Sequence, residues 1–265
     1  MLKTRIKKEI DNYCNNVAIF CDYDNLYYGL TDYGLNITNT QYDIFYFINE
    51  FYEKRKIRTI KAFADFEQIC FNDKNELYLL KHLQNNRVET YNVFGNNPKQ
   101  ECYRKNASDI ELSLSAIETY YKESEIDTFV FISSDSDFIP IMNKLMFYGK
   151  QVHLYYMNNR ANENILKFCN FSIDLIELMN INIERKNPEY WISTIKDILN
   201  NYYLNNNYEN NIMSHKWLLE NIQKKTYMSI NTSNKLINKM VELNVIEKAE
   251  YNNFYGYRLK EMKFF

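Results

Sequence analysis

The sequence comprises 265 residues, of which 46% are hydrophobic and 25% charged, and its formal net charge at pH 7 is −2. This length and apolar content exclude a disordered tail and suffice for one large domain or two small ones. The near-neutral charge excludes a protein that binds nucleic acid through an overwhelming positive field, although it is compatible with local basic patches. Only 5 glycines and 3 prolines argue against an all-β sandwich with many tight turns.

Residues 1–16 predict a basic, amphipathic lead-in helix. From residue 17 to about residue 176, short apolar runs alternate with longer amphipathic segments, which is typical of an α/β fold with a parallel sheet. Runs such as VAIFC and TFVFI are continuously apolar, as expected for strands buried on both faces. The predicted strands are Val17–Asp22, Arg58–Asp65, Arg87–Val93, Thr128–Ser133, Gln151–Tyr156 and Phe171–Leu175. The predicted helices between them are Gln41–Glu53, Asp73–Asn86, Ala107–Lys122, Asp137–Tyr148 and Glu163–Phe168.

The polar stretch Glu184–Glu189 predicts a domain boundary, so we assign residues 17–182 to a first domain and residues 190–265 to a second. A different succession of elements follows this stretch, and it has the order of a winged-helix domain. The predicted elements are helices Trp191–Tyr203, Ser214–Lys225 and Thr232–Leu243, and then two strands within Ile246–Leu259.

The second domain is mildly basic. From residue 183 onward there are 12 basic and 9 acidic residues, against 20 basic and 25 acidic residues before it. Lys235 and Lys239 on the predicted third helix are therefore candidates for contact with nucleic acid. The alternative is a protein-interaction or dimerisation domain with a solvated basic face, so a homodimer or a larger assembly stays open.

No apolar run approaches the ~20 residues that cross a bilayer, and the sequence opens without the pattern of a signal peptide. The five cysteines are scattered, with no C-x-x-C pair and no histidine at zinc spacing. We therefore expect a cytoplasmic protein with reduced thiols and no membrane partner.

Acidic residues gather where two predicted strands end. Asp22 ends the first strand, Asp135 and Asp137 follow the fourth, and Asp109 lies at the start of the helix that leads into the fourth. Doubly wound sheets bind ligands at the carboxyl ends of their strands, where the strand order reverses, so we expect these acids to converge. Clustered carboxylates repel one another unless a cation neutralises them, and oxygen ligands suit Mg²⁺ or Mn²⁺.

Each acid has a purely structural alternative, the capping of a helix or turn. This alternative is strongest for Asp137, because S-x-D before an apolar helix is a common N-cap pattern. Asp24 and Asp65 are weaker candidates, which either support the metal ligands or are simply solvated. Tyr23 and Tyr27 either stack on unpaired bases or belong to the core, and we favour the core.

Three phrases, in this order and separation, resemble the NYN domain, a branch of the PIN-like nuclease superfamily: VAIFCDYDNLYYGL, KNASDIELSLSAIETYY and TFVFISSDSDFIPIMNKLMFYGKQVHLYYM. They span residues 17 to about 176. The matching positions are Asp22 and Asn25, Lys105 and Asp109, and Ser133 to Phe138 with Gly149. Ser134 departs from the family, which usually has Gly at this position, so the backbone turn there is in question.

The resemblance implies a metal-dependent ribonuclease, built as a three-layer sandwich around a parallel sheet of order 3-2-1-4-5. It also implies fusion to small nucleic-acid-binding modules, including winged-helix-like LOTUS domains, which the second domain resembles in layout only. Its implied site has Asp22, Asp109 and Asp135 as primary metal-site acids and Asp137 as a further acid. Asn25 would orient a ligand, water or phosphate. Apart from the resemblance, Asp24, Asp65 and Ser133 are candidates for residues that support the ligands.

The resulting hypothesis is hydrolysis of RNA phosphodiester bonds with Mg²⁺ or Mn²⁺, within the strand rather than from its end, with DNA left open as a substrate. Basic residues near the acids would offset phosphate charge. They are Arg104, Lys105, Lys144 and Arg160.

Two alternatives stay open. A haloacid-dehalogenase-like phosphatase also places D-x-D, here Asp22 and Asp24, after an apolar strand, although Leu26 departs from its usual context. The other alternative is a non-catalytic RNA-binding or scaffold protein in an RNA-processing or defence assembly.

Overall fold

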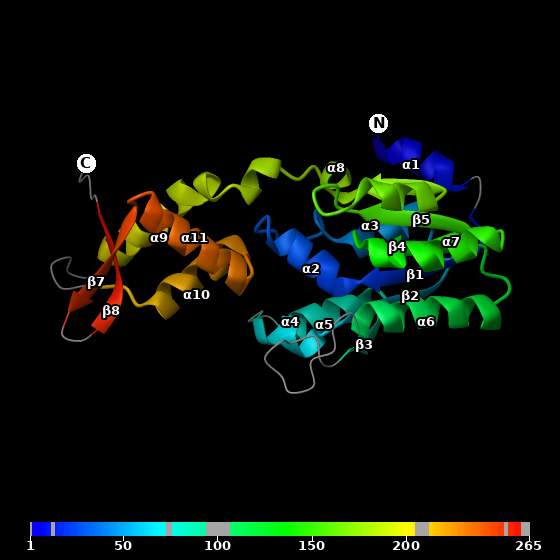
Figure 1. The fold of residues 1–265 in the computed structure, drawn as a ribbon, viewed down its shortest axis with the longest axis horizontal. Helices are drawn as coiled ribbons and strands as arrows, with labels where there is room; N and C mark the ends of the chain where they lie inside the picture. The colour runs from blue at the N-terminus through cyan, green and yellow to red at the C-terminus, as the bar shows by residue number, and fades with distance from the viewer. Residues whose placement is uncertain are drawn as a thin grey trace. The chain divides into compact units, whose positions relative to one another are not determined.

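The computed structural model describes residues 2–11, 14–72, 76–93, 107–204, 212–251 and 254–260. The chain divides into two compact units, one of residues 1–29 and 37–181 and the other of residues 30–36 and 182–265. Figure 1 shows the elements of both in chain order. None of the described helices is long and apolar enough to cross a membrane.

A six-stranded parallel sheet forms the centre of the first unit, in the order β3-β2-β1-β4-β5-β6. Its strands are β1 (Val17–Asp22), β2 (Ile57–Ala64), β3 (Glu89–Asn92), β4 (Thr128–Ile132), β5 (Gln151–Tyr156) and β6 (Phe171–Asp174). The predicted order 3-2-1-4-5 is confirmed, and β6 extends the sheet beyond β5. The reversal of strand order places β1 directly beside β4, and every residue of these two strands is buried.

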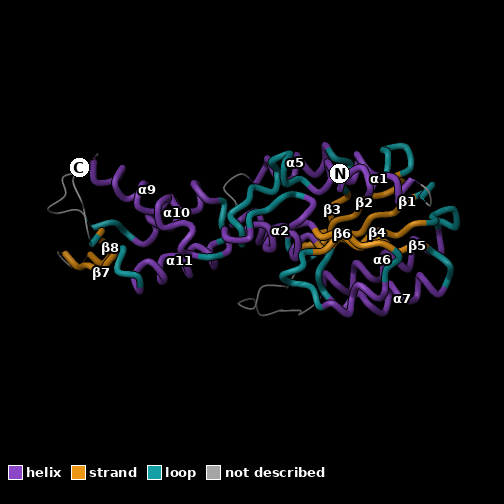
Figure 2. The backbone as a smooth tube through the Cα atoms, turned by 90° about the horizontal axis from the view of Figure 1, so that it is seen from above, coloured by secondary structure: helices purple, strands orange, loops and turns teal. Residues whose placement is uncertain are grey.

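Helices α6 (Ala107–Lys122) and α7 (Ile139–Phe147) cover one face of the sheet (Figure 2). Their apolar residues, including Leu112 and Met142, share a core with Phe20 and Phe131 of the sheet. On the other face lies α3 (Ile44–Phe51), which packs against α1 (Leu2–Asp11). The sheet is therefore the middle of three layers, as expected of an α/β fold.

The remaining helices of this unit are α2 (Tyr23–Thr31), α4 (Phe66–Asn72), α5 (Glu76–Asn85) and α8 (Leu175–Leu178). The prediction missed α2, α4 and α8, which begin at or next to the end of a strand and so carry strand-end signals in the sequence. It also assigned a helix to residues 163–168, which form a 3₁₀ helix instead.

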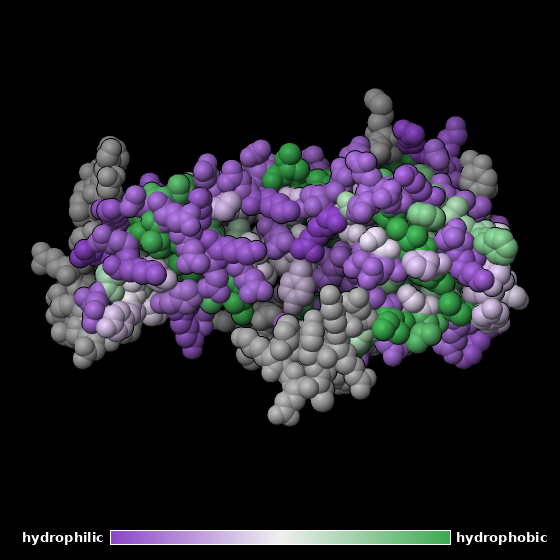
Figure 3. Space-filling model, in the orientation of Figure 1, coloured by the Kyte–Doolittle hydropathy of each residue, from purple (hydrophilic) through white to green (hydrophobic). Residues whose placement is uncertain are grey.

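The outer face of α6 is unusually apolar for a solvent-exposed surface. Hydrophobic side chains reach the surface over the region of α6 in Figure 3. The exposed ones on this helix are Ile110, Leu114, Ile117 and Tyr121, which recur at helical spacing.

The second unit combines three helices with a small antiparallel sheet. Its elements are α9 (Ile192–Leu204), α10 (His215–Thr226), α11 (Ile230–Glu242), β7 (Ile246–Tyr251) and β8 (Phe254–Leu259). Met213, between α9 and α10, forms a further antiparallel bridge with Tyr257 of β8. Residues from every one of these elements, such as Leu199, Ile222 and Leu236, bury one common core.

Residues 30–36 belong to the second unit, whereas the sequence placed them in the first domain. The Arg185 side chain donates hydrogen bonds to the carbonyls of Tyr33 (2.8 Å) and Gly34 (2.7 Å). The Thr232 hydroxyl donates to Asp32 at 2.7 Å. A short segment that follows the first strand is thus held by residues about 150 to 200 positions later, a pairing that local sequence signals do not report.

Candidate functional site

The candidate site begins at the carboxyl ends of the two central strands, β1 and β4, where their register brings two residues level. Cys21 of β1 pairs with Ile132 of β4, so the next residues, Asp22 and Ser133, lie level at the carboxyl edge of the sheet. The Ser133 hydroxyl donates a hydrogen bond to Asp22 Oδ2 at 2.9 Å. The backbone N–H of Asn25 donates to Asp22 Oδ1 at 3.1 Å. Asp22 as a residue is only 5% exposed, so these bonds take the place of hydration at its carboxylate.

Hydrogen bonds of Asn25, in the first turn of α2, and of Ser134, after β4, connect the same two chain segments. The backbone N–H of Ser134 donates to Asn25 Oδ1 at 3.2 Å, and that of Asp135 donates to Ser133 Oγ at 3.1 Å. The Ser134 hydroxyl in turn accepts from the Met157 N–H at 2.9 Å. Ser134 does not have a positive φ, so this turn accommodates serine without strain in place of the family's usual glycine.

Three further carboxylates gather at this edge. Asp109 lies in the first turn of α6, and Asp135 and Asp137 follow β4. A carboxylate oxygen from each of them lies within 4.8 Å of the others. Asp22 is not part of this group of three, but it is close enough to Asp109 for the charge of Asp109 to raise its pKa.

The capping residue at this turn is Asp135. Its carboxylate accepts from the Asp137 N–H at 2.9 Å and so begins the 3₁₀ helix Ser136–Phe138. The cap that the sequence suggested for Asp137 therefore belongs to its neighbour, while the Asp137 side chain is exposed.

The pKa values of two carboxyl groups in the site are raised. Burial, and then the charge of Asp109, raises the pKa of Asp22 to about 7, although its hydrogen bonds from Asn25 and Ser133 act in the opposite direction. Burial, and then the charges of Asp135 and Asp137, raises the pKa of Asp109 to about 6. Crowded carboxylates with raised pKa values are typical of sites that hold a cation or move protons.

The chemistry of these donors fits a hard divalent cation. All three members of the group offer oxygen, the ligand that Mg²⁺ and Mn²⁺ prefer. Within the described part of the chain, the Asp109 carboxylate accepts no hydrogen bond that would otherwise satisfy it. Asp109, Asp135 and Asp137 are therefore the residues that could hold such an ion, with Asp22 beside them.

Two of the weaker candidates have structural contacts. Asp24 accepts from the Asp65 backbone N–H at 3.2 Å, and Asp65 accepts from the Gln68 N–H at 2.9 Å in the first turn of α4. These bonds connect the start of α2 to the residue that follows β2, and they cap the first turn of α4. Tyr23 and Tyr27 are buried, at 1% and 5% exposed, which agrees with the core position expected for them.

The basic candidates lie on different elements of the two units. Arg160 follows β5 and packs beside Gly29 of α2, whereas Lys144 lies in the last turn of α7 with its ammonium 4.9 Å from the Tyr148 ring centre. On α11, Lys235 is exposed and Lys239 pairs with Glu242 at 2.9 Å. Arg104 and Lys105 lie outside the described residues.

The sequence did not indicate the contacts of Ser134, which was noted only as a departure from glycine. Ser133 was expected to support the metal ligands, and its hydrogen bond to Asp22 is a contact of that kind. The signal that could have revealed that bond is the level ending of two neighbouring strands, which makes a hydroxyl on one a partner for an acid on the other.

A family model described as the NYN domain matches residues 16–177. No curated protein matches the sequence. Among solved structures, the chain is similar to one described as the crystal structure of a protein of unknown function, VPA0982, from Vibrio parahaemolyticus RIMD 2210633. That similarity has 18% identity and a TM-score of 0.45, and it covers 61% of this chain and 93% of the other.

Proposed function

Because the chain belongs to the NYN domain family, we propose that it is a metal-dependent ribonuclease that hydrolyses phosphodiester bonds within RNA strands. The observation that supports this function best is the group of three carboxylates at the carboxyl edge of the sheet, next to the buried Asp22. Such a group is costly to keep together unless it holds a cation. RNA is the proposed substrate, and DNA is tested beside it.

Each residue of the candidate site has a proposed role that follows from its surroundings. Asp109, Asp135 and Asp137 would hold Mg²⁺ or Mn²⁺, which when bound lowers the pKa of water and offsets charge on the scissile phosphate. Ser133 fixes the orientation of Asp22, which is held beside Asp109. The Asn25 amide nitrogen donates to no described residue, so it is available to a phosphate oxygen.

The surroundings of Asp22 argue against a haloacid-dehalogenase-like phosphatase. A nucleophilic carboxylate must be ionised and open to substrate, whereas Asp22 is 5% exposed, accepts two hydrogen bonds and has a pKa raised to about 7. Asp24, which would be the acid of that mechanism, is occupied by the Asp65 backbone.

The second unit is proposed to bind the RNA strand. Its order of helix, bridging residue, two helices and hairpin supports a winged-helix layout, in which α11 would be the helix that faces nucleic acid. Asn231, Lys235 and Asn238 are exposed on α11 at positions i, i+4 and i+7, so they share one polar face.

The test is cleavage of labelled single-stranded RNA, structured RNA and DNA by the pure protein, with Mn²⁺, with Mg²⁺ or with EDTA. Wild type is compared with Asp135→Asn, and Asp174→Asn is the matched control. Asp174 likewise lies at the carboxyl end of a strand of the same sheet and caps a helix, by accepting from the Ile176 N–H at 2.9 Å, but it is not in the acidic group. Asparagine retains the capping function at both positions.

We expect RNA cleavage with Mn²⁺ or Mg²⁺ that EDTA abolishes, at least a ~100-fold slower rate for Asp135→Asn, and an unchanged rate for Asp174→Asn. RNA binding with no cleavage by the wild type would instead favour a scaffold. Hydrolysis of a small phosphate ester without RNA cleavage would favour a phosphatase.

A further inference from the structure

The β7–β8 hairpin of the second unit has one face that packs into the core only at one end. Residues paired across the strands share a face: Ile246 with Leu259, Lys248 with Tyr257, and Glu250 with Tyr255. At one end of this face Ile246 and Leu259 are buried in the core, at 1% and 3% exposed. Toward the turn the same face becomes open, and Tyr255 is 71% exposed.

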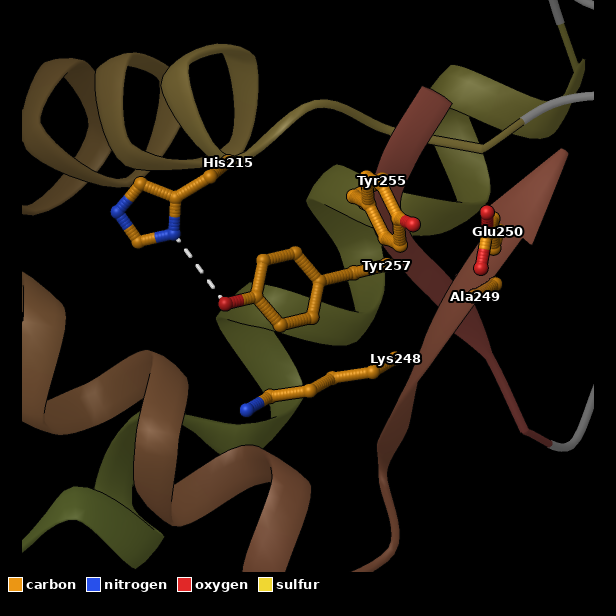
Figure 4. Close-up of a pocket in the computed structure, with 7 residues that line it drawn as sticks. His215, Lys248, Ala249, Glu250, Tyr255 and Tyr257 are labelled. Atoms are coloured by element: carbon orange, nitrogen blue, oxygen red, sulfur yellow. Dashed lines mark hydrogen bonds between the residues drawn. The ribbon is translucent and has the colours of Figure 1, made fainter. Parts of the chain in front are cut away.

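A pocket of about 370 Å³ lies on this open part. His215, Lys248, Ala249, Glu250, Tyr255, Gly256 and Tyr257 line it. His215 is the first residue of α10, and its Nδ1 lies 3.3 Å from the Tyr257 hydroxyl (Figure 4). The volume is within the range of pockets that hold small organic ligands.

The polar side chains that line the pocket differ in how firmly they are held. Tyr257 is held by its contact with His215, and its backbone pairs with Met213 in both directions at 2.9 Å. Lys248, whose side chain extends beside the Tyr257 ring in Figure 4, has no acidic partner in the part of the chain that the structure describes. On the opposite face of the hairpin, by contrast, Glu247 and Arg258 pair with each other.

We infer that this pocket binds one unpaired nucleotide of an RNA strand, with its base stacked on Tyr255 and its phosphate beside Lys248. An exposed tyrosine ring offers a base a flat apolar surface at little entropic cost, and stacking of this kind tolerates any base. The Lys248 ammonium supplies the charge that a phosphate requires.

Glu250 determines the direction in which the nucleotide lies. Its carboxylate is the cross-strand neighbour of Tyr255 and repels phosphate, but it accepts hydrogen bonds from the N–H groups of a base. Lys248 lies two residues away, about 6.8 Å along the strand. The base therefore lies at the Tyr255 end of the pocket and the phosphate at the Lys248 end.

This inference rests on the proposed function for the identity of the ligand, but not for the chemistry at the acidic site. The test is therefore binding without cleavage. The affinity of the full chain for a labelled single-stranded oligouridylate is measured by fluorescence anisotropy in EDTA. The variants are Tyr255→Ala, Tyr255→Phe and Lys248→Ala. The matched controls are Tyr78→Ala, at a tyrosine that is 60% exposed in the first unit, and Lys224→Ala, at an exposed lysine of α10.

We expect Tyr255→Ala to weaken binding at least about fivefold, while Tyr255→Phe, which retains the ring, stays within about twofold of wild type. Lys248→Ala weakens binding and lowers its salt dependence, and both controls bind as wild type does. With 5-iodouridine in the same RNA, light-induced cross-links fall in the tryptic peptide of residues 249–258, which contains Tyr255 and Tyr257.

Wild-type affinity in Tyr255→Ala, cross-links only to the first unit, or no RNA binding by the wild type would each overturn the pocket assignment. If the wild type cleaves RNA but Tyr255→Ala binds it normally, the pocket fails while the proposed hydrolysis stands. If Tyr255→Ala loses binding in a protein that never cleaves RNA, the pocket stands and the hydrolysis fails.

Discussion

Asp109 illustrates the conflict between stability and function at a single residue. Its carboxylate lies among other acids, accepts no hydrogen bond within the described chain, and has a pKa raised to about 6. A side chain placed there for stability alone would not be an acid. Its charge is useful only if a cation joins it, so loss of the charge should benefit the metal-free protein and harm the enzyme.

We predict that Asp109→Asn raises the free energy of unfolding by about 1 kcal/mol at pH 8 in EDTA, since solvent screens part of the repulsion that is removed. Urea denaturation measures this change. The control is Glu111→Gln, at an exposed glutamate two residues further along α6, which should leave the midpoint unchanged. Destabilisation of Asp109→Asn in EDTA would show that its charge is not strained in the fold.

A second prediction concerns pH. The pKa values of Asp22 and Asp109 rise from an ordinary 3.8 to about 7 and about 6 in the folded protein. Between pH 4 and 7 the folded state therefore binds more protons than the unfolded chain, so the free energy of unfolding falls as pH rises through this window. We expect the metal-free urea midpoint to be lower at pH 8 than at pH 5, and Mn²⁺ to restore much of the difference at pH 8. Equal effects of Mn²⁺ at both pH values would contradict this origin.

For single residues, the sequence indicated which acids are candidates for the site, but not which of their carboxylates lie closest together. The D-x-x-N and S-S-D-S-D-F patterns identified Asp22, Asn25, Asp135 and Asp137. Which carboxylates come together depends on side-chain directions set by the turn after β4, where Asp135 caps a 3₁₀ helix. That is why Asp137 joins the group of three while Asp22 lies beside it.

At the level of elements, residues 30–36 differ most from the prediction, because they belong to the second unit. Gly34 has φ +64°, and a Cβ there would lie 2.5 Å from the Thr226 carbonyl oxygen and 2.8 Å from the Trp191 ring. The segment can approach α10 so closely only because this residue has no side chain. A glycine in a short polar stretch predicts a turn, but it does not reveal which distant element the turn contacts.

We therefore predict that Gly34→Ala destabilises the second unit by about 2–4 kcal/mol, from backbone strain together with the clash. Gly149→Ala is the control, because Gly149 also has a positive φ (+76°) but nothing lies within 4 Å of its Cβ position. Both tryptophans, Trp191 and Trp217, belong to the second unit, so their fluorescence reports its unfolding in urea. An unchanged tryptophan transition in Gly34→Ala would contradict the close packing; Gly149→Ala should leave that transition in place.

Long, strongly patterned elements were predictable, and so were short strands such as β6, whereas the short helices α2, α4 and α8 were not. The helix over residues 107–122 and the fully buried β1 and β4 follow from periodicity and apolar runs. The pocket on the hairpin was missed, although its signal is present in the sequence. K-x-E and Y-x-Y on paired strands place four chemically active side chains on one face, but only once the register of the hairpin is known.

The small net charge of the whole chain is the sum of an acidic first part and a mildly basic second part. Residues 1–182 carry 20 basic and 25 acidic residues, whereas residues 183–265 carry 12 and 9. Part of the acidic excess is the group proposed to hold the metal, so the acidic part would perform the chemistry while the basic part holds the strand.

This division predicts different kinetic effects of charge in the two parts. Lys235→Ala should raise KM for RNA several-fold, leave kcat within about twofold, and lower the salt dependence of binding by about one unit of slope. Steady-state cleavage at several salt concentrations measures all three quantities. A fall in kcat with KM unchanged would show that Lys235 does not act through binding.

The proposed hydrolysis requires the acidic group to hold a divalent cation. A titration of the protein with Mn²⁺, with free Mn²⁺ monitored by electron paramagnetic resonance, measures this directly. We predict that the wild type removes Mn²⁺ from solution at neutral pH. The same titration should show at least tenfold weaker binding for Asp135→Asn and unchanged binding for Asp174→Asn. Equal Mn²⁺ binding by all three proteins, or none by the wild type, would show that the acidic group is not a metal site.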